Sequence, residues 1–297
     1  MARRLRRVLM AVLGAVFLFS VCFIIVVQYE YKESQKLYQG AAEQFTASAP
    51  GSTSGGSAGG SVADNGTKGG SGDRADGPDN GSGASGTDIP GQAFPDRPPI
   101  TVDFRALEAV NGDVCGWIYC PDTPINYPVL QGEDNDTYLH HSYDGAYAAA
   151  GSIFVEALNR PDFADANTIL YGHHMRDGSM FACLERWAGE GFYGDHPAVW
   201  LLTPKQDYRI DLFAGYTTSG YSDTYTVFTG PCDELAEYLE RSLEQSDFAA
   251  DGKPDAGADT QSRFVVLSTC AYAFTDARYV LHGVLVPVDS AGGVPFP

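Results

Sequence analysis

The chain has 297 residues and a formal net charge of −19. Its composition divides it into three unequal parts, and only the last, from about residue 100, is rich enough in large apolar residues for a globular core. The net negative charge is carried mostly by the chain after Leu37, since six of the nineteen basic residues precede it. This balance favours solubility and argues against nucleic acid or anionic lipid as the main partner.

The N-terminus has the pattern of a membrane anchor. Residues 1–7 carry four arginines, and Val8 to Val27 follow without a charge, which is long enough to cross about 30 Å of hydrocarbon as a helix. The apolar run exceeds that of a cleaved signal peptide, so we expect an uncleaved, single-pass signal anchor over residues 8–28 of a cell-membrane protein. By the positive-inside rule, residues 1–7 are cytoplasmic and the chain after Gln28 is extracytoplasmic.

Residues 29–99 are expected to form a flexible extracytoplasmic linker. From about Ala41 to Pro99 the composition is dominated by Gly, Ser, Ala, Asp and Asn, and large apolar residues are almost absent. Such a segment cannot bury a core, and as a random coil its reach would be ~40 to 45 Å. The expectation is a globular domain over 100–297 that stands away from the bilayer.

The globular part opens with a predicted helix over 102–110, ended by Asn111-Gly112. Short segments rich in β-branched and aromatic residues follow, and turn signals separate most of them. These predicted strands are 116–119, 153–155, 168–171, 208–216, 264–267 and 279–286. The pattern indicates a mainly β domain, either a barrel or a sandwich.

Two helical insertions interrupt the strands, at 179–187 and at 233–245. The second is acidic and amphipathic, so we expect it to pack one face on the β-structure.

The cysteine pattern does not define a disulfide framework or a zinc site. Five cysteines lie in the exported part, so at least one is free or pairs between chains. Two of them stand five residues apart on a predicted strand and would face opposite sides, which favours ordinary packing positions over a mutual disulfide or zinc binding. Pairing among the others stays open. The five are Cys115, Cys120, Cys183, Cys232 and Cys270.

Three residues could together perform acyl transfer. Cys270 follows the predicted strand 264–267, and His173 ends the apolar run Asn167-Thr-Ile-Leu-Tyr-Gly-His173, in which Gly172 allows close backbone approach. Arg278 comes eight residues after the cysteine, just before the last strand. Each alone has an ordinary interpretation: buried filler, a structural histidine or a surface charge. Together they supply a thiol, a base and a fixed cation for an oxyanion, without a metal or other cofactor.

At this point the residues resemble the sortases, cysteine transpeptidases of Gram-positive bacteria, and within them class B. The resemblance covers nearly all of 100–297. Its motifs are Leu267-Ser-Thr-Cys270 with Arg278 downstream, Tyr171-Gly-His-His-Met175 followed by Asp177-Gly-Ser-Met-Phe181, the run Gly116 to Val129, Asp134-Asn135 with Tyr138-Leu139, and Gly151-Ser-Ile-Phe154. Single motifs are weak, but the ordered set is specific.

The resemblance implies a sortase-like eight-stranded β-barrel with an N-terminal helix, and a helix-bearing loop before the cysteine, for which 233–245 is the candidate. It makes Cys270 the nucleophile, His173 the acid/base and Arg278 the partner of the substrate carbonyl or oxyanion. It also places four residues near the bound peptide: Asn135, Leu139, Tyr171 and Ser268.

Alternative interpretations concern four residues. His174 competes with His173, but adjacent strand residues point to opposite faces, so only one can face the cysteine. His140 and His141 could suggest a metal, yet adjacent histidines without a spaced carboxylate or cysteine make a poor site. Ser268 could equally be a strand-end residue that satisfies backbone groups.

The expected activity is that of an EC 3.4.22-like peptidase and acyltransferase. Cys270 would attack the threonine carbonyl of a C-terminal sorting motif in a surface protein, and an amine would then displace the thioester. That amine could belong to a cell-wall precursor or to a pilin lysine. The alternatives are a cysteine protease, if water is the acceptor, and an inactive surface scaffold.

Overall fold

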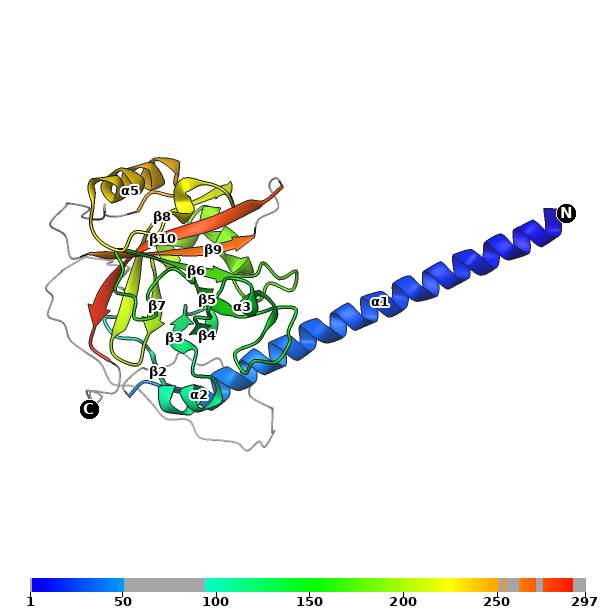
Figure 1. The fold of residues 1–297 in the computed structure, drawn as a ribbon, viewed down its shortest axis with the longest axis horizontal. Helices are drawn as coiled ribbons and strands as arrows, with labels where there is room; N and C mark the ends of the chain where they lie inside the picture. Colours follow the sequence, from blue (N-terminus) through cyan, green and yellow to red (C-terminus); the bar gives the residue numbers. More distant parts are fainter. Residues whose placement is uncertain (1, 51–93, 251–253, 255–261, 271–274, 291–297) are drawn as a thin grey trace, which may run out of the picture.

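The computed structural model describes residues 2–50, 94–250, 254, 262–270 and 275–290 (Figure 1). Its centre is a closed eight-stranded barrel in the order β10-β8-β7-β3-β4-β5-β6-β9. The strands are β3 Val114–Tyr119, β4 Asn126–Leu130, β5 Ile153–Val155, β6 Asn167–Gly172, β7 Ala198–Leu202, β8 Asp207–Ser219, β9 Arg263–Cys270 and β10 Ala277–Val288. The mainly β prediction and the barrel implied by the resemblance are both confirmed.

Two barrel strands were not among the six predicted from composition. β4 contains Pro128, which lacks a backbone N–H and is disfavoured within a sheet. β7 is an unbroken apolar run of five residues, which periodicity alone cannot distinguish from a buried helical turn. Both segments are strands because the closed barrel requires them: β4 joins β3 to β5, and β7 joins β3 to β8.

Alternation along the strands separates the barrel interior from its outer face. The interior holds apolar side chains that are fully buried, including Ile118, Ile153 and Leu267. On the outer face, α5 (Asp233–Gln245) packs Leu235 and Leu239 in one apolar cluster with strand residues of β8 and β9. The predicted amphipathic helix is therefore confirmed, and it lies in the connection from β8 to β9.

The remaining helices after residue 100 are short. α2 (Phe104–Val110) confirms the helix that opens the domain, and the Asp103 side chain caps it by accepting a hydrogen bond from the Ala106 N–H at 2.9 Å. The insertion predicted over 179–187 is a 3-10 helix, η1 (Ala182–Ala188). The others are α3 Thr137–His140, α4 Phe192–Asp195 and η2 Asp223–Tyr225.

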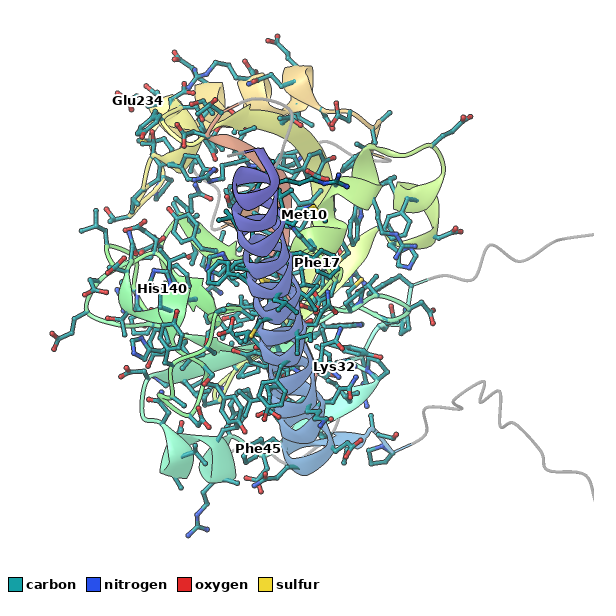
Figure 2. The ribbon with its side chains drawn as sticks, turned by 90° about the vertical axis from the view of Figure 1, so that its right-hand side faces the viewer. Met10, Phe17, Lys32, Phe45, His140 and Glu234 are labelled. Atoms are coloured by element: carbon teal, nitrogen blue, oxygen red, sulfur yellow. The ribbon has the colours of Figure 1, made fainter. Side chains whose placement is uncertain are left out.

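A single helix, α1 (Ala2–Phe45), forms the N-terminal part of the chain and extends far from the barrel (Figure 1). It is long and apolar enough to cross a membrane. At 44 residues its length is ~66 Å by the helical rise. Figure 2 looks at the side of the domain from which α1 extends, with Met10 and Phe17 on the projecting part and Phe45 at the domain.

The structure differs from the expected linker at residues 29–50. The last turns of α1 pack on the barrel, and Tyr38, Ala41 and Phe45 are at most 4% exposed. The Tyr38 hydroxyl donates a hydrogen bond to the Gly151 carbonyl. These apolar residues recur at helical spacing, a signal hidden beside the Gly- and Ser-rich stretch that follows. The part of the expected linker from 51 to 93 lies outside the described residues.

Beyond α1 the chain enters a two-stranded sheet. β1 (Thr46–Ser48) pairs antiparallel with β2 (Ile100–Val102), and the Ala49 N–H donates to the Pro99 carbonyl at 2.8 Å. Both flanks of the Gly-rich segment are therefore attached to the same body. That segment connects two neighbouring strands; it does not connect the apolar helix to the domain.

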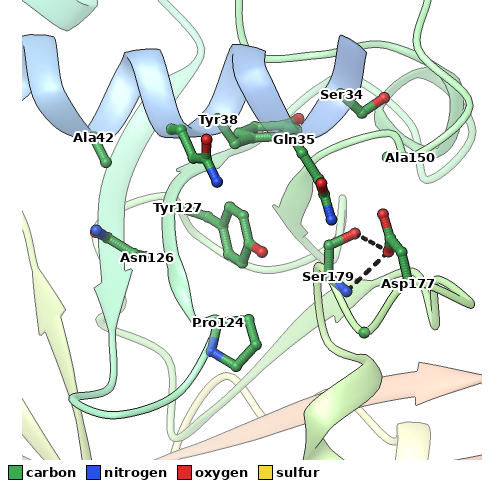
Figure 3. Close-up of a pocket in the computed structure, with 12 residues that line it drawn as sticks. Ser34, Gln35, Tyr38, Ala42, Pro124, Asn126, Tyr127, Ala150, Asp177 and Ser179 are labelled. Carbon is green, nitrogen blue, oxygen red and sulfur yellow. Dashed lines mark hydrogen bonds between the residues drawn. The ribbon is translucent and has the colours of Figure 1, made fainter. Parts of the chain in front are cut away.

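The contact between α1 and the barrel is partly hollow (Figure 3). A cavity of about 220 Å³ lies between Gln35 and Tyr38 of α1, Tyr127 of β4, and Asp177 and Ser179 of the loop after β6. Asp177 is engaged with Ser179, whose hydroxyl donates to it at 2.6 Å. The buried residues near the C-terminal end of α1 thus hold the helix on the domain. One turn closer to its N-terminus, Gln35 shares the cavity with the polar side chains of Asp177 and Ser179.

Replacing residues 51–93 by a Gly/Ser linker of about 15 residues, which reaches ~20 Å, should leave the fold intact. A shorter loop closes at a lower entropy cost, so the free energy of unfolding should rise by about 1 kcal/mol. The comparison is thermal unfolding of fragment 29–297 with and without this replacement.

Fragment 100–297 provides the contrast, since it lacks β1 and the three buried α1 residues. It should melt many degrees below fragment 29–297, because Phe and Tyr truncations of this kind cost several kcal/mol. Equal melting temperatures for the two fragments would contradict the docking of α1.

Candidate active site

Three neighbouring strands bring the predicted catalytic residues to one end of the barrel. In the antiparallel pair of β9 and β10, Arg278 lies directly opposite Cys270. In the parallel pair of β6 and β9, Gly172 lies opposite Thr269. Along the chain, His173 follows Gly172 and Cys270 follows Thr269. The backbone register therefore places all three residues side by side, although they are far apart in the sequence.

The same register assigns them a common face. Ile169, Val266 and Val280, one from each strand, form an apolar cluster outside the barrel. Because side chains alternate along a strand, a position that is an even number of residues from one of these three, on the same strand, belongs to the same outer face. All three predicted catalytic positions satisfy this rule.

Gly172 lets β6 pass close to its neighbours before His173. A Cβ at this position would lie 2.5 Å from the Ile153 side chain and 2.7 Å from that of Phe181. Only glycine fits there, which confirms the close approach expected from the sequence.

The two adjacent histidines have different surroundings. The His173 Nε2 lies 2.8 Å from the Leu139 carbonyl oxygen, which can only accept, so Nε2 carries a proton and donates. The His174 Nε2 lies 3.3 Å from a carboxylate oxygen of Glu185, on η1. His174 thus faces η1, and His173 is held by α3, which carries Leu139.

Glu156 is the centre of the neighbouring polar cluster. It directly follows β5, is 7% exposed, and accepts hydrogen bonds from Asn135 Nδ2 at 2.8 Å to each oxygen. The Tyr171 hydroxyl donates to it at 2.9 Å, and the Leu158 N–H at 3.3 Å. The Asn135 Oδ1 in turn accepts the Ala157 N–H at 2.8 Å. One buried carboxylate therefore orients two of the four residues expected near the peptide.

Ser268 belongs to the same cluster through Tyr225. Its hydroxyl is 2.9 Å from that of Tyr225, and Ser268 itself is 1% exposed. The Tyr225 ring stacks on that of Tyr171 with centroids 6.1 Å apart. Ser268 therefore forms a hydrogen bond with a side chain across the site.

The charged groups around Tyr171 have opposite effects on its pKa. Burial and then the Glu156 carboxylate raise the pKa of Tyr171, while the Arg278 guanidinium acts to lower it. The Tyr171 hydroxyl consequently stays protonated at neutral pH. Arg278 is half-buried, and its Nη1 also donates to the Ala277 carbonyl at 3.0 Å.

Three other thiols are poor nucleophiles. Burial raises the pKa of Cys115, Cys120 and Cys183 to about 12. At neutral pH these groups are thiols, and the thiolate is the reactive form. Cys115 and Cys120 occupy packing positions, as expected, and the Cys115 Sγ contacts the Val129 carbonyl at 3.5 Å.

Comparison with known proteins identifies the family. The chain is 39% identical over 187 residues to sortase B of Listeria monocytogenes, covering 62% of this chain and 74% of that protein. It is 33% identical over 194 residues to sortase B of Staphylococcus aureus, covering 64% and 77%. The chain belongs to the sortase B family. No family model matches it.

Solved structures agree with this assignment. The S. aureus sortase B–substrate complex has a TM-score of 0.58 at 30% identity and covers 63% of this chain and 85% of its own. Sortase B from B. anthracis in complex with AAEK1 has a TM-score of 0.55 at 38% identity and covers 62% and 84%. As a sortase, the protein is a cysteine transpeptidase. In the described part of the chain, no group of three or more His, Cys, Asp or Glu could hold a metal ion.

The sequence reasoning missed Glu156 and Tyr225. A signal for Glu156 was available, because an acidic residue directly after a buried strand is costly unless it has partners. Tyr225 lies in η2, and nothing in its local pattern separates it from the other tyrosines of the chain.

Glu156→Gln should destabilise the domain by about 2 kcal/mol, because the new amide turns a donor toward groups that also donate. For a domain of this size the melting temperature should fall by ~4–8 °C. The matched control is Glu108→Gln, on the exposed side of α2, which should melt like the unmodified chain. Indistinguishable melting of the two variants would remove Glu156 from the centre of the cluster.

Proposed function

We propose that this protein is a membrane-anchored sortase that cleaves a C-terminal sorting motif in surface proteins and transfers the acyl group to an amine. One observation carries the assignment of residues: Arg278 is paired directly with Cys270, and β6, whose last residue precedes His173, runs beside the strand that carries Cys270. A thiol, a base and a cation at one barrel end match the needs of acyl transfer.

In the first half of the reaction, the Cys270 thiolate attacks the threonine carbonyl of the motif. Arg278 stabilises the negative charge that develops on the carbonyl oxygen, and His173 protonates the leaving amine as the peptide bond breaks. The product is a thioester. In the second half an amine, deprotonated by His173, attacks the thioester and releases the thiolate.

Four residues are proposed to hold the peptide: Asn135, Leu139, Tyr171 and Ser268. Their mutual contacts support a preformed surface, since Glu156 fixes the first and third and Tyr225 the last. Leu139 has a second role in this proposal, because its carbonyl also orients His173. Little rearrangement would then be needed on binding.

The anchor is proposed to be α1, with residues 1–7 in the cytoplasm and the catalytic domain outside, as in a single-pass protein of the cell membrane. The acceptor amine is that of a cell-wall precursor or of a pilin lysine. An acidic domain outside the membrane is compatible with peptide substrates, and its net negative charge disfavours nucleic acid as a partner.

The test uses fragment 29–297 with five-residue sorting peptides and amine acceptors, read by mass spectrometry. Amine-dependent ligation is expected, and Cys270→Ala should reduce it by about 10³-fold or more. His173→Ala and Arg278→Ala should each cost ~10²- to 10³-fold. Cys232→Ala is the matched cysteine control and should keep full activity.

The products distinguish the alternatives. Hydrolysis at a rate that added amine does not change would indicate a cysteine protease. An inert fragment across a broad panel of peptides would indicate a surface scaffold that keeps the barrel without the chemistry. Activity that survives in Cys270→Ala would exclude the proposed nucleophile.

A further inference from the structure

The domain begins to cover α1 at the residue where the apolar run ends. Val26 is 50% exposed, Val27 is half-buried, and the contact continues through Tyr31 to the buried Tyr38. Val27, Tyr31 and Tyr38 follow one another at helical spacing on the face of α1 that is turned toward the domain. No length of free helix separates the apolar run from the domain.

The loop after His173 reaches this level of the helix. Arg176 and Asp177 share a recess of about 530 Å³ with Phe23, Ile24 and Val27 of the apolar run. Lys32, one turn beyond that run, lines the same recess. The recess is therefore apolar on its membrane side and carries two cations and one carboxylate on its domain side.

We propose that this recess binds a phospholipid of the outer leaflet, an inference that rests on the anchoring by α1 proposed above. The acyl chains lie against Phe23, Ile24 and Val27, and the phosphate is bound by Arg176 and Lys32. Arg176 is exposed and its guanidinium can bind phosphate oxygens in a bidentate manner. Asp177 at the same rim suits the ammonium of a zwitterionic head group, in keeping with the acidic charge of the domain.

Placement of the catalytic end follows from this contact. Arg176 is three residues after His173, so the barrel end that carries the catalytic residues stands at the head-group layer. Phe45 and α2 lie ~27 Å further along α1 by the helical rise, away from the membrane. The site would meet its peptide substrate close to the bilayer.

The experiment uses the full chain in phosphatidylcholine vesicles whose acyl chains are brominated near the head group. Arg176→Trp is compared with Arg105→Trp, a matched control on the exposed side of α2. The fluorescence of the three native tryptophans is measured with the unmodified chain and subtracted. We expect fluorescence at position 176 to be quenched at least twofold more than at position 105. Equal quenching at the two positions would overturn the proposal.

A second measurement tests the phosphate contact. Amide hydrogen exchange of residues 175–178 in unbrominated vesicles should be several-fold slower in the unmodified chain and in Arg105→Glu than in Arg176→Glu. The same rate in all three would overturn the role of Arg176. Neither readout needs catalysis, and flotation with the vesicles reports anchoring separately. A chain that does not float refutes both anchoring and this inference, whereas one that floats without selective quenching refutes only the inference.

Discussion

The ladder formed by β6, β9 and β10 is the constraint on which the site depends. Its two halves differ: β6 and β9 run parallel, and β9 and β10 run antiparallel. The parallel half brings the C-terminal ends of two strands to the same edge, and the antiparallel half returns the chain to that edge at the start of the third. A shift of one residue in either register would turn a catalytic position to the barrel interior. Burial of the alternating apolar residues on both faces fixes the register and, with it, the site.

The polar cluster next to this ladder is stable only as a whole. A carboxylate as buried as that of Glu156 is costly unless its oxygens are satisfied, and four hydrogen bonds reach it from Asn135, Tyr171 and Leu158. The same bonds remove conformational freedom from two side chains that peptide binding would otherwise have to order. The energy that stabilises the folded domain and the preorganisation of the peptide surface thus come from one arrangement.

Local patterns in the sequence predicted the elements whose signal is local. The amphipathic helix 233–245 and the strand 153–155 have the observed bounds, because apolar periodicity and flanking turns define them. β4 and β7 were missed because their identity depends on barrel closure. The ordered motifs predicted the family and the residues that the register brings together. Glu156 and Tyr225 could not be assigned in the same way, because their side-chain hydrogen-bond partners lie 15 to 43 residues away along the chain.

Composition misled at the junction between helix and domain for a related reason. A Gly- and Ser-rich segment after an apolar helix predicts a tether, and this holds only if the two ends of the segment are attached to different bodies. Here the last turns of α1 and β1 already belong to the barrel assembly, so the Gly-rich segment begins and ends on it. The orientation of the domain relative to α1 is then set by the buried face of a continuous helix. With α1 spanning the membrane as proposed above, a rigid helix would not vary the height of the active site above the bilayer as a random coil would, and a peptide would have to enter the site at that height.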